Sequence, residues 1–161
     1  DWMVQDPYTL ELMDVDDDDD DDRVVRRLQL GIDDRVVQRF ALAVLYYSTG
    51  GLTSWKVSWL SPSTECSWGE PNVDCNFNNV VDLISLPGEG LSGKIPGEIG
   101  LLSSLTYLDL NLNDLGGTIP TEIGFFSLLT LLALWSNNLE ASIPTEIGLL
   151  TSLWRLGLHT N

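Results

Sequence analysis

A spacing of 24 residues constrains this chain more than any other feature of its sequence. Pro96, Pro120 and Pro144 are 24 residues apart, and several other positions keep the same step. These positions are Ile95, Ile119 and Ile143; Glu98, Glu122 and Glu146; Gly100, Gly124 and Gly148; Leu105, Leu129 and Leu153; Leu108, Leu132 and Leu156; Leu110, Leu134 and Leu158; and Asn113, Asn137 and Asn161. A fixed period of this length predicts a solenoid, in which each repeat forms one coil that stacks on the next.

The repeat unit reads LxxLxLxxNxLxGxIPxxIGxLxx. The coils are expected to start near Val81, Leu105, Leu129 and Leu153. The alternating leucines predict a short strand with its apolar side chains pointing inward, so that neighbouring coils pair as a parallel sheet. An asparagine follows each strand, and its carboxamide can both donate and accept hydrogen bonds. We therefore predict a ladder that satisfies unpaired backbone groups, formed by Asn113, Asn137 and Asn161.

The segment before the repeats predicts a helix followed by a loop rich in tryptophan. Asp33 and Asp34 provide N-caps, and Gly50 and Gly51 end the helix. The apolar stripe at helical spacing comprises Val36, Val37, Phe40, Ala41, Val44 and Leu45. The side chains expected to cover the open end of the solenoid are Trp55, Trp59 and Trp68.

The chain holds two cysteines, Cys66 and Cys75. They do not form a CxxC pattern, and a structural metal site usually needs four ligands, so a disulfide is favoured over a metal site. A disulfide indicates an oxidising compartment. Two free buried thiols are the alternative.

Two stretches carry a resemblance to a known family: "LTYLDLNLNDLGGTIPTEIGFFSL" (105–128) and "LTLLALWSNNLEASIPTEIGLLTS" (129–152). They resemble the plant-type leucine-rich repeat (LRR) family. Residues 35–75, which include "ECSWGEPNVDC", resemble that family's N-terminal cap with its disulfide. The sequence departs from the family pattern at Glu89, where an asparagine is expected, and at Ala141, where a glycine is expected.

The resemblance implies an α/β fold: a right-handed leucine-rich repeat solenoid with short parallel strands on its concave face and an N-terminal helical cap. Three regions follow from it. We expect an acidic N-terminal arm at 1–34, the cap at 35–79, and about 3.5 coils at 80–161, of which the last is incomplete.

The charge of the chain excludes one class of partner. The net charge is −16, and residues 1–34 alone carry 13 acidic residues against 3 arginines. Nucleic acid is not an expected partner, because phosphate binding needs a basic face. No apolar run reaches the about 20 residues that cross a bilayer, so no transmembrane segment is predicted in this chain.

No catalytic motif stands out, and we predict neither enzymatic activity nor a cofactor. The GxGxxG match from Gly88 to Gly93 coincides with the repeat, and Gly93 is the coil glycine. Asp82 and Asp109 could form a carboxylate pair, since both should face outward on adjacent strands, but nothing in the sequence indicates a raised pKa for either.

The N-terminal arm holds an unusual run of acids: Asp16, Asp17, Asp18, Asp19, Asp20, Asp21 and Asp22. It is either a solvated tether or, because ordering adjacent carboxylates needs positive charge, a contact for Ca²⁺ or an arginine-rich surface. Residues 1–13 are rich in apolar side chains, and we expect them to dock on this domain or on another copy.

The outward positions of the strands form the predicted binding surface. The candidate ligand-binding residues are Tyr107, Asp109, Asn111, Leu131, Trp135, Trp154, Arg155 and His159. The LRR resemblance implies a non-enzymatic recognition module, secreted or at the cell surface, that binds a peptide, protein or glycan on the concave face. The alternative is a structural subunit that assembles into a complex or filament through residues 1–13 and the open C-terminal coil. We also expect that the repeats continue beyond Asn161 or that this end is an interface.

Overall fold

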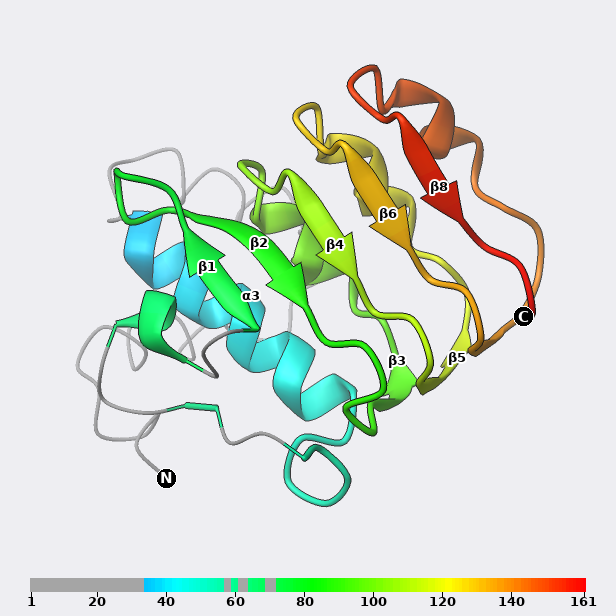
Figure 1. The fold of residues 1–161 in the computed structure, drawn as a ribbon, viewed down its shortest axis with the longest axis horizontal. Helices are drawn as coiled ribbons and strands as arrows, with labels where there is room; N and C mark the ends of the chain where they lie inside the picture. Colours follow the sequence, from blue (N-terminus) through cyan, green and yellow to red (C-terminus); the bar gives the residue numbers. More distant parts are fainter. Residues whose placement is uncertain (1–33, 57–58, 61–63, 69–71) are drawn as a thin grey trace, which may run out of the picture.

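The computed structural model describes residues 34–56, 59–60, 64–68 and 72–161 (Figure 1). The predictions for the docking arm (1–13), the acidic run (16–22) and Asp33 lie outside the described residues.

Helix α3, Asp34–Ser48, caps one end of the solenoid (Figure 1). It ends as predicted, because Gly50 takes a positive φ of 79° and the Gly51 N–H bonds back to the Tyr46 carbonyl at 2.8 Å. The predicted apolar stripe was wrong in part. Its members Ala41 and Leu45 are buried, but the remaining stripe residues are only half-buried, namely Val36, Val37, Phe40 and Val44.

The buried face of α3 instead includes Gln38, Leu42 and Tyr46. Two contacts explain this rotation of the face. The Gln38 Oε1 accepts a hydrogen bond from the Val81 N–H at the start of the first repeat strand, and the Tyr46 ring packs edge-on against Trp55. A hydrophobicity pattern cannot register a buried glutamine that bonds to a strand.

Five strands form the concave sheet, in the order β1, β2, β4, β6 and β8 (Figure 1). They are β1 (Val73–Cys75), β2 (Val81–Ser85), β4 (Tyr107–Asp109), β6 (Leu131–Ala133) and β8 (Arg155–Gly157). The last four are parallel, with residues 24 apart aligned, as the period predicts. Strand β1 is antiparallel to β2 and covers the edge that the first coil would otherwise expose.

Each coil continues past the concave strand into a second short strand and then a 3-10 helix. The second strands are β3 (Ser92–Lys94), β5 (Asp114–Gly117) and β7 (Asn138–Leu139), and they pair as a separate parallel sheet. The convex side carries η2 (Gly97–Leu101), η3 (Thr121–Phe125) and η4 (Thr145–Leu149). The sequence analysis did not predict the second sheet, because its segments are too short and too rich in glycine to show strand periodicity.

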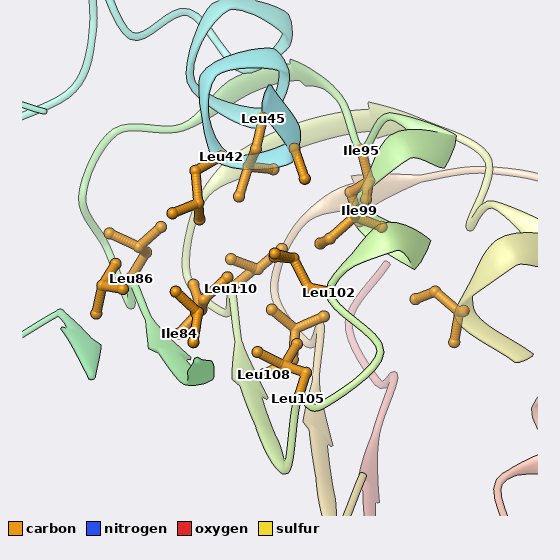
Figure 2. Packing of buried hydrophobic residues seen from close by; sticks show 14 of the residues in the cluster. Leu42, Leu45, Ile84, Leu86, Ile95, Ile99, Leu102, Leu105, Leu108 and Leu110 are labelled. Atoms are coloured by element: carbon orange, nitrogen blue, oxygen red, sulfur yellow. The ribbon is translucent and has the colours of Figure 1, made fainter. Parts of the chain in front are cut away.

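The core runs between the two sheets and the convex 3-10 helices, and α3 closes it. In Figure 2, Leu42 and Leu45 from α3 face Ile95 and Ile99 from the first coil. The repeat leucines below them are fully buried: Leu105, Leu108, Leu110, Leu129, Leu132 and Leu134. Burying one such side chain stabilises the fold by about 1.5–3 kcal/mol, so stacked coils gain what a single coil cannot.

The asparagine ladder forms as predicted. The Asn113 Oδ1 accepts from the Gly90 and Leu91 N–H groups at 3.0 and 3.1 Å, and its Nδ2 donates to the Leu86 and Leu110 carbonyls at 2.8 and 3.0 Å. Asn137 and Asn161 bond to the equivalent groups one and two coils further along. Each asparagine therefore ties its own turn to the preceding coil.

The cap is held together by a disulfide and an aromatic cluster. Cys66 and Cys75 form the predicted disulfide, which joins η1 (Glu65–Ser67) to β1. The rings of Trp55 and Trp59 meet at right angles with centroids 4.7 Å apart, and Trp59 stacks on Tyr46 at 6.5 Å. Trp59 and Trp68 are buried, and Trp55 packs against the core. These contacts agree with the predicted capping role, while the region boundaries at 34/35 and 79/80 stay predictions.

Candidate functional site on the concave face

Three columns of outward residues cross the concave sheet from coil to coil. Leu83, Tyr107, Leu131 and Arg155 align in the first column, and Ser85, Asp109, Ala133 and Gly157 align in the second. Backbone hydrogen bonds place Asn111, Trp135 and His159 in the third. The register therefore brings seven of the eight predicted site residues onto one face, and Trp154 directly precedes β8 at its edge.

The best-defined element of this face is a stacked ring pair. The Trp135 indole and the His159 imidazole are parallel within 4°, with centroids 5.4 Å apart. A side chain at Gly157 would not fit beside them, because a Cβ there would lie 2.9 Å from the Trp135 Cδ1. The glycine thus leaves room for the Trp135 indole, which follows β6, to lie beside β8. The sequence placed the two residues in one column but gave no signal for the stacking.

The exposed fraction of the side chains on the concave face rises toward β8. Trp154 is 75% exposed, and Arg155 and His159 are also exposed. Trp135 and Tyr107 are half-buried. The accessible part of the predicted site is therefore an aromatic and cationic group on the last two coils, which we call the β8 patch: Trp135, Trp154, Arg155 and His159.

Three of the predicted binding residues are not exposed as expected. Asp109, Asn111 and Leu131 are 9%, 5% and 8% exposed. The expectation failed because outward side chains on the closely spaced parallel strands cover one another. Asp109 is also drawn to the backbone: its Oδ1 accepts from the Asn111 N–H at 3.1 Å and from the Asn111 Nδ2. These residues form the floor of the face rather than its rim.

Tyr107 lies beside the floor, on the same strand as Asp109 and one strand away from Leu131. Its hydroxyl donates a long hydrogen bond of 3.5 Å to the Asp109 Oδ2. Burial raises the pKa of Tyr107 above its ordinary value, the charge of Asp109 and this hydrogen bond raise it further, and Arg155 opposes the shift. The phenol is therefore a neutral donor at physiological pH.

The Asp82 and Asp109 pair does not have the geometry of a glycosidase. Asp109 aligns with Ser85, and Asp82 lies three residues before Ser85 on β2. The backbones of Asp82 and Asp109 are therefore separated by about 10 Å along the strand direction. Catalytic carboxylates of glycosidases lie about 5–9.5 Å apart. The pKa of Asp82 is nevertheless raised, first by burial and then by the negative charge of Asp74, which the sequence did not indicate.

The glycine-rich stretch from Gly88 to Gly93 is part of a coil. Gly88, Gly90 and Gly93 have positive φ angles, and the stretch leads into β3 rather than into a helix that could bind phosphate. Within the described ranges, no three His, Cys, Asp or Glu side chains gather in a way that could hold a metal ion. None of the described helices has the length and apolarity needed to cross a membrane.

Comparison with known proteins places these features in a family. No family model matches the chain. Over 80 residues, half of the chain, it is 36% identical to a probable LRR receptor-like serine/threonine-protein kinase of Arabidopsis thaliana, and it spans about a tenth of that relative's length. In the solved BIR3–SERK2 complex from Arabidopsis thaliana, the matching chain is 34% identical with a TM-score of 0.64, covering 75% of this chain and 67% of that one. A plant ice-binding protein is 27% identical with a TM-score of 0.67, covering 79% of this chain and 41% of that one.

Proposed function

This chain belongs to the plant-type leucine-rich repeat family, and we propose on that basis that it is a non-enzymatic extracellular recognition module that binds a peptide on its concave face. The disulfide supports an extracellular setting, since such bonds persist in oxidising compartments. The matched structure from the BIR3–SERK2 complex belongs to a protein that forms a complex with another protein, which supports a recognition role.

The β8 patch is the observation that carries this proposal. Aromatic and arginine side chains dominate the energetics of protein interfaces. Here the Trp135 indole stacks on His159 in space that Gly157 leaves free, which adds an aromatic surface beside the exposed Trp154. Arg155 adds a planar donor for a carboxylate or a backbone carbonyl.

The likeness to an ice-binding protein does not favour that activity here. An ice surface is periodic, so a protein face that matched it would repeat one side chain from coil to coil. The first concave column instead reads Leu83, Tyr107, Leu131 and Arg155. A fold does not fix a function, and this face has the varied chemistry of a peptide site.

The proposal can be tested by selecting peptides from a random dodecapeptide phage library on the intact chain. We expect enriched peptides to bind the wild type and to lose about tenfold or more in affinity on Trp154→Ala/Arg155→Ala, because two exposed anchors are removed. Both side chains are exposed, so the double variant should fold normally, which circular dichroism checks.

Phe125→Ala is the matched control, since Phe125 is 65% exposed on the convex side. It should leave the affinity unchanged. Failure to enrich any peptide, or equal affinity for the wild type and the double variant, would contradict the proposal.

A further inference from the structure

The floor of the concave face holds a carboxylate whose hydrogen bonds are unevenly distributed. The Oδ1 of Asp109 receives two donors, both from Asn111. From the described part of the chain, its Oδ2 receives only the long bond from Tyr107, at 3.5 Å. Among the described residues no cationic side chain forms an ion pair with Asp109, and the backbone of Arg155 is two strands away, about 10 Å across the sheet. One side of a nearly buried negative charge is therefore left poorly compensated.

A second acceptor beside it is also unmet. The Oδ1 of Asn111 is buried and accepts no hydrogen bond, although the residue is only 5% exposed. Rotating the carboxamide would not help, because its Nδ2 donates to Asp109 and a flip would turn Oδ1 against the carboxylate. Buried polar groups in folded proteins normally have partners, so an orphan acceptor next to a carboxylate indicates a missing donor.

The chemistry of the missing donor follows from its surroundings. The two acceptor groups can bind several N–H donors, and a positive charge would compensate the carboxylate. A guanidinium or ammonium group provides both the N–H donors and the positive charge. Tyr107 lies on the same strand as Asp109, Trp135 aligns with Asn111 on the next coil, and aromatic faces attract cations. The net charge of −16 also favours the approach of a cationic ligand.

We propose that Asp109 and Asn111 form a subsite that receives a lysine or arginine side chain of a bound peptide. This inference rests on the proposed recognition function and specifies the ligand: a peptide with a basic residue that inserts beside the β8 patch. Because Trp135 aligns with Asn111 on the next coil, its indole resonance reports on binding there.

The test uses methylguanidinium chloride as the probe, titrated into ¹⁵N-labelled protein. We expect saturable shifts of the Asn111 side-chain amide and of the Trp135 indole N–H, with both shifts absent in Asp109→Asn. Sodium chloride at equal ionic strength controls for salt. Glu122→Gln, which removes a carboxylate from the convex helix η3, should leave the shifts intact.

If Asp109→Asn does not fold, Asn111→Ser removes the unmet acceptor and should weaken the shift of the Trp135 indole. The inference is overturned if the probe gives no saturable shift, or the same shift in the Asp109 and Asn111 variants. It also fails if peptides selected on the intact chain lack basic residues. In that case loss of their binding on Trp154→Ala/Arg155→Ala would still uphold the recognition function, so the two failures can be told apart.

Discussion

At the scale of single residues, the turn after each concave strand depends on a backbone conformation that few residues favour. In every coil, the residue before the ladder position has a positive φ. These residues are Gly88 (64°), which precedes Glu89 in the first coil, and Leu112 (58°), Ser136 (52°) and Thr160 (61°), which precede the ladder asparagines. Only the first of these is a glycine. The hydrogen bonds of the ladder asparagines hold the other three in a conformation that costs roughly 1–2 kcal/mol for ordinary residues. No sequence pattern marks this position, so its geometry could not be predicted.

Ala141 is the residue where a simple substitution should help. It occupies the coil-glycine position with a φ of 66°, whereas Gly93 and Gly117 hold the equivalent positions in the earlier coils. Ala141→Gly should stabilise the fold by about 0.5–1 kcal/mol, because the strain relieved exceeds the added entropy of the unfolded chain. Urea denaturation measures the change.

Gly117→Ala provides the reciprocal control for that substitution. It should destabilise the fold, since a Cβ at Gly117 would lie 3.1 Å from the Lys94 Cγ and the φ is 71°. Equal stability of the wild type and both variants would show that the coil turn does not require the left-handed conformation.

At the scale of elements, an ionised carboxylate on β2 destabilises the β1–β2 hairpin in a pH-dependent way. Burial and then the charge of Asp74 raise the pKa of Asp82 in the folded state, so the folded protein binds the proton more tightly than the unfolded chain. Protonated Asp82 therefore contributes its whole stabilisation of the folded state below the unfolded pKa of about 3.9. This contribution is lost as the pH rises through the higher pKa of the folded state.

Asp82→Asn should accordingly stabilise the protein at pH 7, and the gain over the wild type should shrink at pH 3, where Asp82 is protonated. Urea denaturation at the two pH values measures this. Asp74→Asn should give a smaller gain at pH 7, because it removes only the second cause. A gain from Asp82→Asn that is as large at pH 3 as at pH 7 would refute the electrostatic explanation.

The elements also show what the sequence could and could not predict. The concave strands were predictable in both position and register because their inward apolar residues keep a 24-residue period, with Val81 and Ile84 in place of leucine in the first coil. The buried face of α3 was displaced from the predicted stripe because Gln38 bonds to a strand 43 positions away, a tertiary contact that hydrophobicity does not encode. The sequence did not predict the buried floor of the site for a similar reason. The exposure of an outward side chain depends on its neighbours in adjacent coils, whereas the pattern of a single strand shows only which face a residue occupies.

At the scale of the whole molecule, the coils are held together by close contacts between successive repeats. A Cβ at Gly124 would lie 2.8 Å from the Cβ of Glu146 on the next coil, and one at Gly100 would meet Glu122 at the same distance. Gly148 has nothing within 4 Å. The repeated glycine is thus required for space, so that the next coil can approach.

Gly124→Ala should therefore cost about 1–3 kcal/mol, the usual penalty for overpacking an interior contact. Gly148→Ala is the matched control and should leave stability unchanged in this chain. Thermal denaturation of the two variants measures the difference. Similar losses for both would mean that helix geometry, and not coil stacking, selects the glycine.

We propose that this molecule recognises a peptide on its concave face, through the β8 patch. Hydroxyl-radical footprinting with a phage-selected peptide tests it most directly, because Trp154 and Phe125 are both highly exposed and reactive but lie on opposite sides of the solenoid. We expect the peptide to lower the oxidation rate of Trp154 severalfold and to leave that of Phe125 unchanged. Protection of Phe125 with no change at Trp154 would contradict it.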